Sequence, residues 1–263
     1  MNTRDFLRTH RVFTLDEAVR ELAPPRGSAG AVERLRYHLD AGRVTRVTRE
    51  VYATVPAGQK AEDFVPDPVL VASAARADAV FSHHSALELL GVGHSVWNQT
   101  TTYTESRRQP LRLNGRTVRF LQDPARIGQD RLLATRRVEH MGRVVRVTGP
   151  ERTLVEGFLR LDLAGGPEEF VTSAGGFAAL DLCLLMNLLE QYRVRKLWSA
   201  VGWFLERFQQ DFSVSEQVLA ALECRRPVSP QYLERRRKGG RLDARWNLIL
   251  PERLVAGGEP DES

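Results

Sequence analysis

Three arginines recur at every third position in the stretch GRVTRVTREVYATVP (residues 42–56), at Arg43, Arg46 and Arg49. A guanidinium group presents a planar fork of N–H donors that fits phosphate oxygens and the acceptor edge of guanine. The alternating valines and threonines predict two strands, 44–47 and 51–55, joined at Thr48-Arg49-Glu50. On such a hairpin, the arginines could reach DNA phosphates or enter the minor groove. The alternative is that they only protect a strand edge from aggregation.

A helix is predicted immediately before this hairpin, with Ser28 as its N-cap and Gly42 at its end. Its apolar face carries Val32, Leu35 and Leu39. The opposite face is predicted to carry Gly30, Arg34, Tyr37 and Ala41, with Glu33 and His38 beside them and Arg36 near the core edge. A helix that reads the major groove needs long donors at the centre of its outer face. Arg34 and Tyr37 fit best, the alternative being an ordinary solvated face.

Two shorter helices are predicted upstream, over residues 2–9 and from Leu15 to Leu22. Thr14 and Glu17 have the spacing of a capping box at the start of the second one. Three short helices followed by a two-stranded ribbon is the order of a winged helix-turn-helix. We therefore expect residues 1–58 to form a DNA-binding domain of this type.

The charge distribution favours a polyanionic partner for the same segment. The chain of 263 residues has a formal net charge of +5, and residues 1–60 hold eleven basic and seven acidic side chains. The other 203 residues are therefore almost neutral, and a basic segment of this size suits nucleic acid. Only three of the 38 basic residues are lysines. Arginine-favouring codon usage also explains that bias.

The remainder, residues 59–255, is predicted to be one larger mixed domain, followed by a disordered tail over 256–263. Helices are expected at 66–76 and 82–90, and a helical region from 148 to about 225 that includes 182–192 and 194–208. Strands are expected at 99–105, 116–121, 132–139, 143–147 and 245–250. The fold class is therefore α/β in the broad sense, more narrowly α+β, with a helical C-terminal half.

The sequence gives little support for an enzyme, a cofactor or a metal site. The lysines are preceded two positions earlier by Gly58, Val194 and Arg236, so no acid-x-Lys nuclease element is present. His83 and His84 are adjacent and point to different sides of a helix, which makes them a poor metal pair. No phosphate-binding glycine loop or nucleophile elbow occurs. No apolar run is long enough to span a bilayer, and the N-terminus lacks a signal-peptide pattern. We expect a cytoplasmic, non-enzymatic protein.

Several segments together resemble the AbiEi family of antitoxins from bacterial type IV toxin–antitoxin and abortive-infection systems. They are FTLDEA (13–18), the hairpin stretch above, SHHSALELLG (82–91), VTGPERTLVEGF (147–158) and RWNLILP (245–251). The resemblance implies a winged helix that binds inverted repeats in its own promoter. It also implies a C-terminal domain that neutralises an AbiEii-like nucleotidyltransferase toxin. One departure is Glu50, because the family commonly has glycine there, where a left-handed turn would favour it.

Five residues of the C-terminal segments are candidates for contact with the toxin, namely Glu151, Arg152, Trp203, Arg245 and Trp246. Each has an alternative. Glu151 completes a capping-box pattern with Thr148, Arg152 could pair with an acid, and Trp203 could belong to the core. Arg235-Arg236-Arg237-Lys238 could contact DNA or toxin, or could be a solvated charge run.

Two other functions remain open at this point. One is a winged-helix regulator whose C-terminal domain senses a small molecule. The other is a nucleic-acid enzyme that uses carboxylates not identifiable from the sequence.

Overall fold

The computed structural model describes residues 2–22, 27–128, 130–234 and 239–256. The fold is mixed α+β, as the sequence predicts. The chain divides into two compact units. The first contains residues 1–79, 98–122 and 139–145, and the second contains 80–97, 123–138 and 146–263. Residues 1–58 therefore lie within a larger unit. Most of the predicted tail and all of the basic run Arg235–Lys238 lie outside the described residues.

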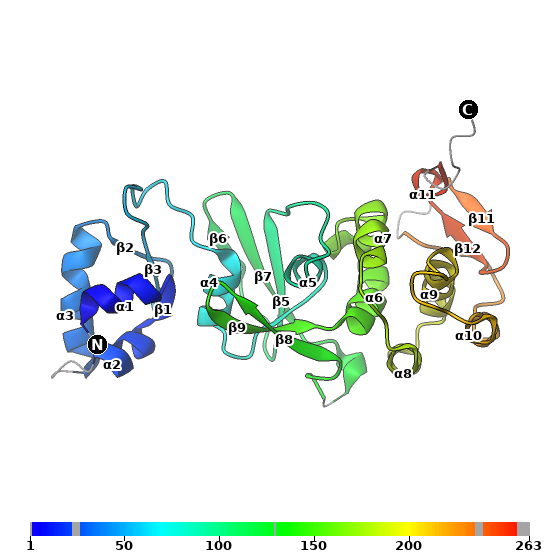
Figure 1. The fold of residues 1–263 in the computed structure, drawn as a ribbon, viewed down its shortest axis with the longest axis horizontal. Helices are drawn as coiled ribbons and strands as arrows, with labels where there is room; N and C mark the ends of the chain where they lie inside the picture. The colour runs from blue at the N-terminus through cyan, green and yellow to red at the C-terminus, as the bar shows by residue number, and fades with distance from the viewer. Residues whose placement is uncertain (1, 23–26, 129, 235–238, 257–263) are drawn as a thin grey trace. The chain divides into compact units, whose positions relative to one another are not determined.

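The first unit begins with a small module of helices and strands (Figure 1). In chain order its elements are α1 (Thr3–Thr9), β1 (Val12–Thr14), α2 (Leu15–Leu22), α3 (Gly27–Asp40), β2 (Val44–Arg46) and β3 (Val51–Thr54). The strand order is β1-β3-β2, with both pairings antiparallel. Phe6, Phe13 and Leu35 are fully buried in the hydrophobic core of this module. The predicted hairpin is confirmed, whereas β1 was not anticipated from the sequence.

The predicted capping box is confirmed at the start of α2. The backbone N–H of Glu17 donates to Thr14 Oγ1 at 3.1 Å, and the backbone N–H of Thr14 donates to Glu17 Oε2 at 2.7 Å. The other carboxylate oxygen of Glu17 accepts a hydrogen bond from Arg143 at 2.8 Å. Arg143 also donates to the carbonyl oxygen of Val12 at 3.3 Å. The Glu17 side chain thus completes the cap at the N-terminus of α2 and also binds an arginine that is distant in the sequence.

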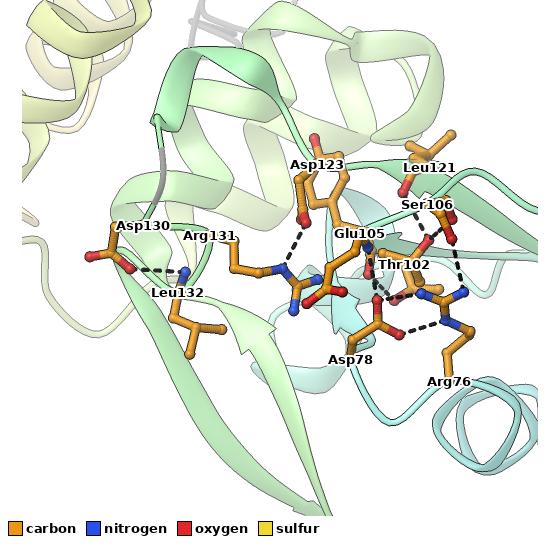
Figure 2. A network of polar contacts seen from close by, with 12 residues as sticks. Arg76, Asp78, Thr102, Glu105, Ser106, Leu121, Asp123, Asp130, Arg131 and Leu132 are labelled. Atoms are coloured by element: carbon orange, nitrogen blue, oxygen red, sulfur yellow. Dashed lines mark hydrogen bonds and ion pairs between the residues drawn. The ribbon is translucent and has the colours of Figure 1, made fainter.

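The remainder of the first unit consists of α4 (Pro68–Ala75), β5 (Gln99–Thr104), β6 (Leu111–Leu113), β7 (Arg116–Gln122) and residues 139–145. Strand β7 lies between β6 and β5, antiparallel to β6 and parallel to β5. A polar network follows the end of α4 (Figure 2), where Arg76 forms a two-pronged pair with Asp78. Arg76 also donates to Ser106, and the backbone N–H of Glu105 donates to Asp78 at 2.8 Å. The hydrogen bond from Arg76 lowers the pKa of Asp78 to about 2.

The second unit contains the helical half of the chain, a group of strands and a separate small sheet near the C-terminus. Strands β4 (Val80–Phe81), β9 (Arg143–Thr148) and β8 (Thr135–His140) are neighbours in that order, with β4 and β9 parallel. The connected ends of β8 and β9, within residues 139–145, belong to the first unit and not to the second. The helices are α5 (His84–Leu89), α6 (Pro150–Leu159), α7 (Pro167–Gly175), α8 (Leu182–Tyr192), α9 (Arg195–Arg207), α10 (Glu216–Glu223) and α11 (Glu252–Ala256), with short 3-10 turns η1 (Ala125–Ile127) and η2 (Leu161–Leu163). The aromatic rings of Phe158, Phe170 and Phe204 meet in its core.

A second small sheet of this unit has the order β10-β12-β11. Its strands are β10 (Gln231–Tyr232), β11 (Arg241–Asp243) and β12 (Leu248–Leu250). The observed strand β12 is shorter than the strand predicted over 245–250. Asn247, just before β12, has a positive φ of 47°, which is not an extended conformation. The two short strands β10 and β11 were not predicted. Within the described ranges, no helix is long and apolar enough to cross a bilayer.

We predict that Glu17→Ala lowers the free energy of unfolding by roughly 1–2 kcal/mol, because it removes half of a capping box and one half-buried ion pair. Chemical denaturation of the full chain measures the change. Asp16→Ala is the matched control, since Asp16 is an exposed acid in the same helical turn. Equal losses for the two variants would contradict a specific contribution from Glu17.

Candidate nucleic-acid interface

Helix α3 ends in the way that the sequence predicts. The backbone N–H of Arg43 donates to the carbonyl of His38 at 2.9 Å, and that of Gly42 donates to the carbonyl of Leu39 at 3.0 Å. Gly42 has a φ of +65°. This paired pattern is the Schellman motif, which needs a left-handed residue that glycine supplies without strain. The motif fixes the direction in which the chain leaves α3 and enters the hairpin.

The two faces of α3 follow the prediction with two corrections. Ala31 and Leu35 are fully buried, while Arg34 and Tyr37 are exposed. Gly30, expected on the outer face, is buried instead, because the buried stripe includes positions 30 and 31 as well as 35. Arg36, expected near the core edge, is exposed for the same reason. Arg36 therefore belongs to the exposed basic face. The predicted apolar face of Val32, Leu35 and Leu39 had placed it near the core.

Ser28 does not precede the helix, because α3 already begins at Gly27. It lies exposed in the first turn. A residue in a first helical turn has a backbone N–H without an intrahelical acceptor. Ser28 thus keeps an exposed position on the helix, although its predicted place as the N-cap is wrong.

Arg34 connects the two helices that precede the hairpin. One of its terminal nitrogens donates to the carbonyl oxygen of Leu22, the last residue of α2, at 3.2 Å. That carbonyl has no acceptor use within its own helix, so the arginine satisfies a helix end. The guanidinium has five N–H donors, which leaves most of them for another acceptor. Arg34 is therefore both a brace between α2 and α3 and an exposed cation.

Tyr37, His38 and Arg43 form a small cluster where α3 meets the hairpin. Tyr37 is 63% exposed, and the guanidinium of Arg43 lies 5.5 Å from the centre of its ring. The rings of Tyr37 and His38 meet edge to face at 5.3 Å. Burial, followed by the positive charge of Arg43, lowers the pKa of His38. The neutral form of His38 is therefore favoured, and the positive charge of this cluster rests on Arg43.

The hairpin turn uses one of its three arginines for its own structure. Arg46 donates to the carbonyl oxygens of Thr48 at 3.1 Å and Arg49 at 2.9 Å, which ties the turn together. The backbone N–H of Val51 donates to Thr48 Oγ1 at 3.2 Å. None of the residues 48–50 has a positive φ. Glu50 therefore imposes no left-handed strain, and the turn does not need a glycine at this position.

Arg49 is the arginine of the hairpin that stays available. It is exposed, and its side chain makes no hydrogen bond or ion pair with the described residues. Between Ser28 and Glu50 the chain has five arginines and three acids, and all five arginines are exposed. The arrangement is a basic helix face beside a basic hairpin, and such a surface can bind an anionic polymer.

Four of the five C-terminal candidates are buried in the second unit, and Arg245 is partly exposed. Glu151 is 3% exposed and Arg152 is fully buried. Glu151 does not complete a capping box, because it accepts a hydrogen bond from the backbone N–H of Asp181 at 2.8 Å. The residue before α6, Gly149, is its N-cap and makes no side-chain cap, although the predicted helix start with a proline in its first turn is confirmed. Both acidic and basic groups of this segment thus serve the fold.

Arg152 is the centre of a buried polar network. It pairs with Glu156 at 2.9 Å and donates to the carbonyl oxygens of Arg131 and Leu133. The hydroxyl of Tyr192 donates to the same Glu156 carboxylate. Burial, followed by the negative charge of Glu156, raises the pKa of Tyr192. The alternative prediction that Arg152 pairs with an acid is confirmed.

Trp203 and Trp246 are core residues of the same unit. Trp203 is 6% exposed and Trp246 is fully buried. The Trp246 ring passes so close to Gly202 that an added Cβ there would lie 2.0 Å from ring carbon Cζ3. The indole N–H donates to Glu206 at 2.6 Å, and Arg245 binds Glu206, Glu216 and Glu223. The contacts of Arg245 and Trp246, and the burial of Trp203, make these residues parts of the fold.

The adjacent histidines do not form a metal site in the described part of the chain, where no group of three potential ligands comes together. His84 is 1% exposed and stacks on Trp97 at 4.9 Å. Its Nε2 lies 3.2 Å from Glu169 Oε1, which also accepts from Ser173 and from the backbone N–H groups of His94 and Ser95. Burial opposes ionisation of Glu169, but these hydrogen bonds lower its pKa to about 2.

Comparison with known proteins identifies a solved structure that has the same fold. No protein-family model matches the sequence, and no curated protein matches it significantly. The crystal structure of the RV2827C protein from Mycobacterium tuberculosis is similar, with a TM-score of 0.64 at 18% sequence identity. The similarity covers 96% of this chain and 92% of that one. At this identity, it shows a common α+β fold along nearly the whole length of both chains.

Proposed function

We propose that residues 1–58 form a winged helix-turn-helix that binds double-stranded DNA. The observation that carries the proposal is the exposed face of α3, with Arg34 and Tyr37, directly beside the hairpin that exposes Arg49. The element order of this module, in which two consecutive helices precede a two-stranded hairpin, supports it as well. In this arrangement α3 enters the major groove and the hairpin lies along the phosphate backbone.

We further propose that the DNA is the promoter of the protein's own operon, with inverted repeats, and that binding represses transcription in the bacterial cytoplasm. The proposed second activity is non-enzymatic neutralisation of an AbiEii-like nucleotidyltransferase toxin. Both roles rest on the sequence segments that resemble the AbiEi family. Glu151, Arg152 and Trp246 are buried, so the proposed contact with the toxin does not rest on their side chains.

Arg34→Ala should weaken binding to the cognate promoter by roughly 1–3 kcal/mol and reduce discrimination against mutated operators, because this side chain is proposed to contact base edges. Titration of labelled operator and scrambled duplexes measures both effects. Since Arg34 also braces α2, thermal unfolding must accompany the titration. An unchanged ratio between operator and scrambled duplex would show that Arg34 reads no bases.

Arg49→Ala should weaken binding to all duplexes to a similar extent and reduce the slope of log K against log salt by about 0.9, as expected for one lost phosphate contact. Arg49 is a cleaner test than Arg46, because Arg46 also holds the turn together. Arg112→Ala is the matched control, since it removes an exposed arginine from β6. If both variants lose the same slope, the effect comes from net charge rather than from the hairpin.

For the antitoxin role, co-expression of the full chain should restore growth of cells that express a nucleotidyltransferase-like protein encoded beside this gene. The double variant Arg34→Ala, Arg49→Ala should rescue equally well when expressed from an unrelated promoter, because neutralisation is assigned to the other part of the chain. Colony counts with and without toxin induction measure the effect. Absence of rescue by the parent chain would refute the antitoxin role and leave the DNA-binding proposal intact.

A further inference from the structure

A pocket of about 760 Å³ lies within the first unit, at the opposite end of β3 from the hairpin turn. Its apolar wall includes Leu7, Val12, Val55 and Leu70, all less than 10% exposed, together with Phe64. Such a volume lies in the range of pockets that bind small organic molecules. The pocket therefore has both the size and the apolar surface for a ligand with a hydrocarbon or aromatic body.

Three arginines line the same pocket, Arg8 from α1, Arg11 from the segment before β1, and Arg116 from β7. None of the three side chains makes a hydrogen bond or ion pair with the described residues. This contrasts with Arg34, Arg46 and the other arginines that bind carbonyl or carboxylate oxygens. An apolar wall with unpaired guanidinium groups favours an anionic head group, because such a group supplies charge-assisted hydrogen bonds.

Asp67 is the single acid among the lining residues, and it is already engaged. Its Oδ1 accepts from the backbone N–H of Leu70 at 2.8 Å, as the N-cap of α4, and lies 3.1 Å from His140 Nε2. Asp67 therefore has its own partners, and the lining groups keep a positive surplus. A neutral or cationic ligand would leave that surplus uncompensated.

We propose that this pocket binds a small organic anion, with its apolar body against Leu7, Val55 and Leu70 and its anionic head on Arg8, Arg11 and Arg116. The site is separate from the proposed DNA-binding face on α3 and does not depend on it. Because the pocket contacts both α1 and the end of the central strand β3, an occupant would touch the module's core from the side away from the hairpin turn.

The fluorescent sulfonate 8-anilinonaphthalene-1-sulfonate is a suitable probe for the native full-length chain, in the absence of nucleic acid. We expect saturable binding that octanoate displaces, whereas its neutral counterpart 1-octanol displaces the probe at least tenfold more weakly. Arg8→Gln and Arg116→Gln should each weaken octanoate binding about tenfold. Arg4→Gln is the matched control, because Arg4 is exposed on the same helix and does not line the pocket.

Circular dichroism and thermal unfolding verify that the variants are folded. Equal displacement by octanoate and octanol would overturn the proposal, since the arginines would then contribute nothing. Octanoate affinity at the parent value in both pocket variants would overturn it as well, even if those variants bound duplex DNA more weakly. Failure of the chain to bind operator DNA would refute only the proposed DNA-binding function.

Discussion

The carboxylate of Glu17 is the point on which the arrangement of the N-terminal module depends. A helix N-terminus carries unpaired N–H groups and a partial positive charge, and Arg143 brings a full positive charge close to it. The negative charge of Glu17 compensates both positive groups. One carboxylate oxygen accepts a hydrogen bond from the backbone N–H of Thr14, and the other accepts one from Arg143. Arg143 in turn binds the carbonyl of Val12 in β1. At the other end of α2, Arg34 binds the carbonyl of Leu22. Arginine contacts thus hold both ends of α2. Because Arg34 belongs to α3, its hydrogen bond to Leu22 also ties α3 to the C-terminal end of α2.

Some arginines of this protein bind oxygen atoms within the fold, and others remain available to a partner. The net charge of the chain does not distinguish the two groups. Arg46 donates hydrogen bonds to carbonyl oxygens, and the completely buried Arg152 donates to carbonyl oxygens and to the Glu156 carboxylate. Arg245 likewise binds three glutamates, a contact set that raises its pKa, with Glu216 as the largest cause. A guanidinium with several oxygen partners projects little positive potential into solvent. The cations that remain for a partner have few or no internal acceptors. Arg49 in the hairpin and Arg8 in the pocket have none among the described residues, and Arg34 has a single carbonyl.

Local sequence signals predicted the parts of the fold that local contacts determine. The capping box at Thr14 and Glu17, the glycine closure of α3 at Gly42 and the apolar helix 182–192 all depend on residues within a few positions of one another. Strand β1 was missed because three residues give no readable period and their partner, β3, lies about forty residues away. The pairing of Glu17 with Arg143 was unpredictable for the same reason. In the candidate interface, the exposed positions Arg34 and Tyr37 of α3 were predicted correctly. The buried face was not fully predicted, because it also includes Gly30 and Ala31.

The segments that resemble the antitoxin family in the C-terminal part have a common physical property, which is burial. His84 of the first segment and Arg152 of the second are almost inaccessible to solvent, and so is Trp246 of the third. Residues in such positions are constrained by packing and by the need to satisfy buried polar groups. The resemblance of these segments is therefore carried by core positions, and it does not identify a surface that would recognise a partner. The exposed face of α3 is the better guide to a partner, because burial does not account for Tyr37, which is 63% exposed beside Arg43.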